Sequence, residues 1–194
     1  MISYPPVMNQ NVNSQITQIL SSDNNSQNTL DKVFELMYDD IKNMANIQLY
    51  KLNAGQTITP TVLVNECYLK LCKPENLSFE NRKHFIYTIA RCMRQYLVDR
   101  VKQKYRQKRD GEKIADALSS VIGEKDINFE LLDLDAVINK LDKINPSLAE
   151  LAVLKFFSGH SLDEIAKIQG VSRSTIMRKW SMAKSFIVTL KEDL

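Results

Sequence analysis

Apolar residues recur every three or four positions over most of this chain, which is the spacing of one face of an α-helix. A first apolar stripe runs from Leu30 to Leu52, a second lies at 60–72, and the longest runs from about 82 to 106. Two further helical patterns follow at about 131–144 and from Pro146 toward Gly159. No segment alternates with a period of two for long enough to predict a strand, so the pattern predicts an all-α fold.

The segment SLDEIAKIQGVSRSTIMRKW (161–180) places two short helical patterns around one glycine. Ser161 and Glu164 have the spacing of a capping box, in which each side chain accepts a backbone N–H of the other residue. Gly170 closes the first helix, where a positive φ is needed, and Ser172 caps the second. This arrangement is typical of a helix-turn-helix unit.

Interruptions in the helical patterns divide the chain into four parts. We predict two small helical bundles joined by a flexible acidic linker, and a flexible tail in front of them. The tail is rich in Asn, Gln and Ser. The boundaries are 1–28 for the tail, 29–109 for the first bundle, 110–130 for the linker and 131–194 for the second bundle.

Charge is partitioned strongly along the chain, although its net value is only +3. The segment 82–109 carries ten Lys or Arg against one acid, whereas 110–135 carries eight acids against two Lys. Within the helix at 82–106, we expect the face bearing His84, Tyr87, Arg91 and Arg94 to stay in water or to meet a partner. The layout suggests two anion-binding surfaces separated by an acidic connector.

The remaining composition is ordinary for a globular protein, with 44% hydrophobic and 25% charged residues. No apolar run is long enough to predict a membrane span, and the first residues do not have the pattern of a secretory signal. We therefore expect a cytoplasmic location and no membrane partner.

The second helix of the helix-turn-helix pattern combines a buried stripe with an exposed cationic end. A helix that enters the DNA major groove needs long cationic donors and short hydroxyls at its N-terminal end. Such residues occur there: Arg173, Ser174, Met177, Arg178 and Lys179. The alternative from this motif alone is a helical bundle whose last helix has a solvated basic face.

Four stretches in order resemble the extracytoplasmic-function (ECF) group of bacterial RNA polymerase sigma factors, and within it the branch of ECF-like sigma factors. They are ITPTVLVNECYLKL (58–71), FENRKHF (79–85), ARCMRQYLVDRVKQKYRQKR (90–109) and LAELAVLKFFSGHSLDEIAKIQGVSRSTIMRKWSMAKSF (148–186). The resemblance covers about 30–194 and implies a protein that lends promoter specificity to core RNA polymerase.

The resemblance also implies partners and site residues. The first bundle would bind the β′ clamp helices of core RNA polymerase and capture bases of the promoter −10 element. The second would read the −35 element as duplex and touch the β flap. An anti-sigma protein is a further candidate partner.

Three groups of residues match the family's functional segments. The polymerase contacts are Asn65, Glu66 and Lys70. The −10 contacts are Asn76, Phe79, Asn81, His84, Tyr87, Arg91, Arg94, Arg100, Lys102, Lys104 and Arg106. The −35 contacts are Ser172, Arg173, Ser174, Thr175, Met177, Arg178 and Lys179. Phe79 has the alternative of being a core residue, and the three polymerase contacts of being ordinary solvated residues.

Two other function classes compete with this interpretation. A free-standing helix-turn-helix regulator would bind operator DNA without polymerase, but it would not need the second cationic segment at 82–109. A nucleic-acid enzyme is disfavoured because His84 and His160 lie in different halves, with no carboxylate cluster, phosphate loop or zinc spacing beside them. We predict no catalytic residue, no metal site and no cofactor.

Overall fold

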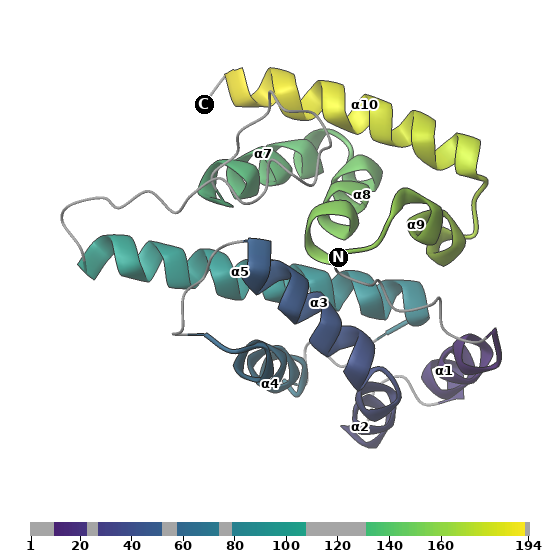
Figure 1. Cartoon of the computed structure of the whole chain (residues 1–194). Coiled ribbons are helices and arrows are strands. Elements are labelled where there is room, and N and C mark those ends of the chain that lie inside the picture. The colour runs from purple at the N-terminus through teal and green to yellow at the C-terminus, as the bar shows by residue number, and fades with distance from the viewer. Residues whose placement is uncertain (1–9, 23–26, 52–57, 74–78, 108–130, 193–194) are drawn as a thin grey trace.

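The computed structural model describes residues 10–22, 27–51, 58–73, 79–107 and 131–192, and these form nine helices with no strand among them (Figure 1). The all-α prediction is confirmed. The helices are α1 (Gln10–Ser22), α2 (Gln27–Leu36), α3 (Tyr38–Lys51), α4 (Pro60–Leu71), α5 (Arg82–Gln107), α7 (Leu131–Ile144), α8 (Pro146–Phe157), α9 (Leu162–Gln169) and α10 (Arg173–Glu192). Within the described part of the chain, none is long and apolar enough to cross a membrane.

Helix α5 lies at the centre of the structure. In Figure 1, α3 and α4 lie on one side of α5, and α7, α8 and α9 lie on the other. Because neighbours cover α5 on two sides, buried residues occur around much of its circumference, including Phe85, Ile89, Met93 and Val98. The buried apolar side chains of both groups of helices therefore form one continuous core.

Aromatic rings organise the core on each side of α5. Phe34 of α2 packs edge-to-face against Phe85 of α5, with ring centroids 6.3 Å apart, and Phe79 packs edge-to-face against Phe85 at 5.1 Å. On the other side, Phe156 of α8 packs against Trp180 of α10 at 5.8 Å. Such contacts add to the free energy of burying the rings and fix how the helices face each other.

Helix boundaries follow the local signals expected from the sequence. The Thr59 hydroxyl accepts the N–H of Val62 at 3.2 Å, and Pro60 occupies the first turn of α4, where its missing N–H costs nothing. The Asn145 side chain likewise accepts the N–H of Leu148 and so caps α8, and Pro146 is the first residue of that helix. Both caps lie next to the helix that they begin, so the signal for each boundary is local in the sequence.

The prediction of a flexible tail over residues 1–28 is wrong for 10–22, which form α1. Ile16 and Leu20 of this helix are completely buried. Helix α1 packs against α2 and α5, so it belongs to the first group of helices. The polar composition of 10–22 obscured a narrow apolar stripe. Packing of this stripe against α2 and α5 is sufficient to stabilise the helix.

The first apolar stripe, from Leu30 to Leu52, does not form the single helix that was expected. It forms α2 and α3, separated by a turn at Met37. The N–H of Met37 still donates to Val33 O at 3.0 Å, and that of Ile41 to Met37 O at 2.9 Å. The apolar spacing continues through the turn, so periodicity alone did not reveal the change of direction. The predicted linker at 110–130 lies outside the described residues.

Candidate nucleic-acid interface

Helices α9 and α10 form the predicted helix-turn-helix unit. The Ser161 hydroxyl accepts the N–H of Glu164 at 3.2 Å, and the Glu164 carboxylate accepts the N–H of Ser161 at 2.7 Å, which completes the capping box. Gly170 ends α9 with φ +66°, a conformation that costs least for glycine. The Ser172 hydroxyl then accepts the N–H of Thr175 at 3.1 Å at the start of α10.

The N-terminal end of α10 presents its polar residues to solvent. Ser172, Arg173, Ser174, Met177 and Arg178 are exposed, and Thr175 and Lys179 are half-buried.

Contacts beside this end orient some of the side chains. The Arg173 guanidinium contacts the Asp163 carboxylate of α9 at 2.7 Å, and the Lys179 ammonium donates to Ser147 Oγ at 3.4 Å. Arg178 has no hydrogen-bond or ionic partner among the described residues. The buried face of α10, with Ile176, Trp180, Ala183 and Ile187, points the opposite way. This geometry leaves one cationic, hydroxyl-bearing helix end free to approach an anionic surface.

The basic face of α5 is only partly available. Arg91, Arg100 and Lys102 are exposed, and Tyr87 is half-buried. Burial raises the pKa of the Tyr87 phenol, whereas the nearby Arg91 opposes that rise. The side chains of Lys104 and Arg106 lie outside the described residues.

Arg94, which was expected on the same solvated face, is only 6% exposed. Its Nε lies 3.3 Å from Asp135 Oδ1 of α7, and an Nη donates to Asn139 Oδ1 at 2.9 Å. Burial lowers the pKa of the guanidinium, and Asp135 opposes that change. The expectation of a solvated Arg94 is wrong because α7 covers it, a contact between residues 41 positions apart in the sequence.

The predicted base-capturing residues around the start of α5 make structural contacts here. Asn81 Oδ1 accepts the N–H of His84 at 3.0 Å and so caps the helix. His84 Nδ1 accepts the N–H of Glu80 at 3.3 Å. Phe79 is 1% exposed and packs on Phe85, which matches the alternative of a core residue. Asn76 lies outside the described residues.

The outer face of α4 is exposed where polymerase contacts were predicted. Asn65 and Glu66 are exposed, and the Lys70 ammonium donates to Gln95 Oε1 of α5. The sequence interpretation missed two apolar side chains on this face, each about one helical turn from Asn65 and Glu66. Val62 is 40% exposed and Leu69 is 61% exposed. Both residues lie opposite the buried stripe of α4, and this place in the helical pattern could have identified them as exposed apolar residues.

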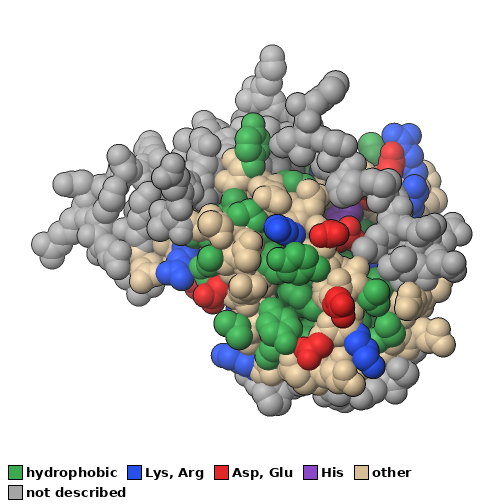
Figure 2. All heavy atoms as spheres, turned by 60° about the horizontal axis from the view of Figure 1, so that its bottom comes forward, with side chains coloured by type: hydrophobic (Ala, Val, Ile, Leu, Met, Phe, Trp, Pro, Cys, Tyr) green, Lys and Arg blue, Asp and Glu red, His purple; other side chains and the backbone are tan. Residues whose placement is uncertain are grey.

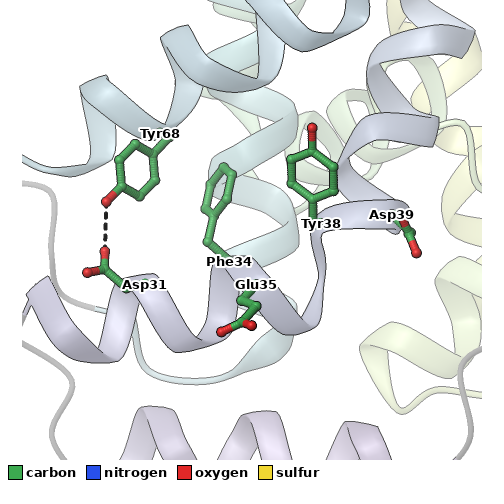
Figure 3. Close-up of a pocket in the computed structure, with 6 residues that line it drawn as sticks. All are labelled: Asp31, Phe34, Glu35, Tyr38, Asp39 and Tyr68. Atoms are coloured by element: carbon green, nitrogen blue, oxygen red, sulfur yellow. Dashed lines mark hydrogen bonds between the residues drawn. The ribbon is translucent and has the colours of Figure 1, made fainter.

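A hollow of about 460 Å³ lies between α2, the start of α3 and α4 (Figure 3). Its lining consists of three acidic and three aromatic side chains, Asp31, Phe34, Glu35, Tyr38, Asp39 and Tyr68. Figure 2 shows hydrophobic and acidic side chains together on this side of the molecule.

The Tyr68 hydroxyl donates to Asp31 Oδ1 at 2.8 Å, and this hydrogen bond is the main cause that raises the pKa of Tyr68 to about 12. The phenol therefore stays neutral, and the carboxylates give the hollow a negative character. A hollow with this lining suits a cationic side chain, which gains from carboxylates and from aromatic faces.

Among the described residues, no group of three or more His, Cys, Asp or Glu is placed to hold a metal ion. The two histidines do not meet a shared carboxylate. His84 contacts backbone, and His160 Nδ1 lies 2.7 Å from Ser158 Oγ.

A comparison with protein families gives a match to the family described as ECF sigma factor, over residues 9–192. Searches of curated proteins and of solved structures gave no match. The matched range includes α1, which the resemblance over 30–194 did not cover, and it spans both groups of helices.

Proposed function

The chain belongs to the ECF sigma factor family, whose members act in transcription initiation with RNA polymerase and promoter DNA, and we propose a division of that work among its surfaces. The observation that carries the proposal is the family match across both groups of helices, each of which presents an exposed polar surface. The family is one of transcription factors, and the surfaces described above are suited to binding.

In this proposal, α10 reads the −35 element in the major groove. Arg173 and Arg178 supply the long donors, and Ser172, Ser174 and Thr175 supply the short hydroxyls. The Arg173–Asp163 ion pair is exposed, so it is worth little energy, but it orients the guanidinium before DNA arrives. Met177 is 46% exposed and is placed for an apolar contact, such as a thymine methyl group.

Helix α5 and the segment before it would capture the −10 element. Arg91, Arg100 and Lys102 would hold the phosphate backbone, which contributes affinity and salt dependence but little sequence choice. Asn76, Asn81 and His84 would contact unstacked bases, while Phe79 supports them from the core. Tyr87 and Arg94 join this surface only when α7 and α8 leave it.

The outer face of α4 and the adjoining hollow would bind core polymerase at the β′ clamp helices. Leu69 and Val62 supply apolar area on either side of Asn65 and Glu66, and apolar area of this kind is typical of the centre of a protein interface. The hollow's carboxylates would accept a Lys or Arg of the polymerase. The second group of helices would meet the β flap, and an anti-sigma protein would compete for these same surfaces.

The test is run-off transcription with purified core polymerase on a library of genomic promoter fragments. We expect specific transcripts only when both the chain and core polymerase are present. The chain alone should bind the same fragments weakly in a gel-shift assay.

A matched pair of variants assigns the polymerase contact. Leu69→Lys should lower the amount of core polymerase recovered in a pull-down at least tenfold, because it places a charge in the apolar part of the interface. Tyr50→Lys changes an exposed hydrophobic residue on α3, to which no polymerase contact is assigned, and should not. Strong sequence-specific binding by the chain alone, with no effect of polymerase, would instead identify a free-standing regulator.

A further inference from the structure

The two arginines at the N-terminal end of α10 differ in how contacts within the chain orient them. Arg173 Nε donates to Asp163 Oδ1 of α9 at 2.7 Å, which is the length of a charge-assisted hydrogen bond. Arg178 has no hydrogen-bond or ionic partner in the part of the chain that the structure describes. The guanidinium of Arg173 is therefore oriented before any partner arrives, whereas that of Arg178 is not.

The contact with Asp163 leaves most of the donors of Arg173 available. A guanidinium carries five N–H groups in one plane, and Nε–H is only one of them. The four N–H groups on the two Nη atoms make no hydrogen bond to a described residue, and the side chain is 75% exposed. Two of these N–H groups are able to donate to O6 and N7 of one guanine, the commonest specific contact in the major groove.

The Asp163 carboxylate also changes which DNA groups Arg173 favours. An unpaired cation binds any phosphate and so contributes affinity without sequence choice. The carboxylate offsets much of the charge that attracts a phosphate, and it is itself repelled by phosphates, but it leaves the directional Nη–H donors in place. Pairing therefore shifts Arg173 from phosphate binding toward base recognition, which raises specificity more than affinity.

Both members of the pair belong to helix ends with defined geometry. Asp163 lies in the first turn of α9, behind the capping box, where the helix dipole stabilises a carboxylate. Arg173 is the first residue of α10 and directly follows the capping residue Ser172. The turn that joins the two helices therefore sets the distance between the carboxylate and the guanidinium.

We propose that Asp163 is a positioning residue that sets Arg173 to recognise one guanine of the −35 element. This inference rests on the function proposed above, and it assigns the base choice at that position to the pair rather than to Arg173 alone. Asp163 acts through Arg173, so its loss should reduce discrimination at one base pair without a general loss of DNA affinity.

The base preference of the full chain with core polymerase tests this positioning. The probes are duplexes from a promoter transcribed in the assay above, with each upstream base pair replaced in turn by the other three. Competition binding should show a guanine preference at one position that Arg173→Ala removes. Asp163→Asn should lower that preference at least fivefold and leave the other positions within twofold. It should also steepen the dependence of log affinity on log salt by about 1, because the released Arg173 is able to bind a phosphate.

Three control variants separate positioning from a general effect of charge or folding. Asp163→Glu keeps a carboxylate and should retain most of the guanine preference. Glu192→Gln removes one exposed carboxylate at the far end of α10 and should leave the preference unchanged. The double variant Asp163→Asn with Arg173→Ala should match Arg173→Ala alone, since the effect of Asp163 requires the guanidinium.

A full guanine preference in Asp163→Asn would overturn the positioning role. An equal loss at every upstream position would overturn it as well, because Asp163 would then only support the fold. If the unaltered chain with polymerase prefers no base at any upstream position, the proposed recognition of the −35 element itself fails, and the role of Asp163 fails with it.

Discussion

His160 is a half-buried titratable residue near the contact between the two groups of helices. Burial is the main cause that lowers the pKa of its imidazole, Arg82 lowers it further, and Glu164 opposes both. The folded chain therefore favours the neutral ring, whereas the unfolded chain takes up a proton below a pH of about 6.5. Folding stability should then fall as the pH falls through that value.

Replacing His160 with Gln should remove this contribution. We expect the thermal midpoint of the unaltered chain to fall between about pH 7.5 and pH 5.5, and that of His160→Gln to fall less. Differential scanning calorimetry at the two pH values measures the difference. His84→Gln, which alters the other histidine, should keep the dependence that His160 causes, and an identical slope for all three chains would contradict this account.

At the scale of single residues, sequence patterns identified functions that depend on near neighbours. The capping box at Ser161 and the positive φ of Gly170 were predictable because their partners lie within a few positions. The burial of Arg94 was not, since Asp135 and Asn139 are far along the chain and belong to another helix. A basic residue beside an apolar face looks the same in sequence whether water or a carboxylate covers it.

At the scale of helices, α1 shows how composition can mislead. Ile16, Ile19 and Leu20 have helical spacing, but the Asn, Gln and Ser residues around them predicted a flexible segment. Ile16 and Leu20 are fully buried and Ile19 is half-buried, so three apolar side chains provide the docking face. Helices α4, α5 and α7 to α10 were predictable because each has either a broad stripe or a capping residue.

The packing of α1 is tested by Leu20→Ala. Removing a fully buried leucine side chain should lower the free energy of unfolding by about 3 kcal/mol, because the cavity closes only partly. Denaturant titration followed by circular dichroism measures the loss. Gln15→Ala, on the exposed side of the same helix, should change stability by less than about 0.5 kcal/mol. Similar stabilities for both variants would mean that α1 is not docked.

At the scale of the whole molecule, the two groups of helices share α5 as a common packing surface. The sequence predicted two separate bundles, because charge changes sign between 82–109 and 110–135 and the helical pattern stops there. The same opposite charges that suggested separation include Asp135, which instead joins α7 to α5. Opposite charges can either mark a linker or join two helices. The three-dimensional path of the chain decides between these outcomes, and the spacing of apolar residues does not reveal that path.

Solution scattering tests the arrangement of the whole chain. We expect Asp135→Lys to have a larger radius of gyration than the unaltered chain, because the introduced ammonium would repel Arg94 and release α7 and α8 from α5. Asp133→Lys should keep the radius of the unaltered chain. An unchanged radius for Asp135→Lys would show that the apolar contacts hold the two groups together without the ion pair.

The pairing of Arg94 with Asp135 has a consequence for how such a chain diverges. In the proposed scheme, Arg94 serves an internal carboxylate in one state and promoter DNA in the other. A substitution at position 94 would remove the internal contact and the DNA contact together, whereas a substitution at position 135 would remove the internal contact alone. Substitutions at 135 and 139 should therefore be tolerated far more often than substitutions at 94.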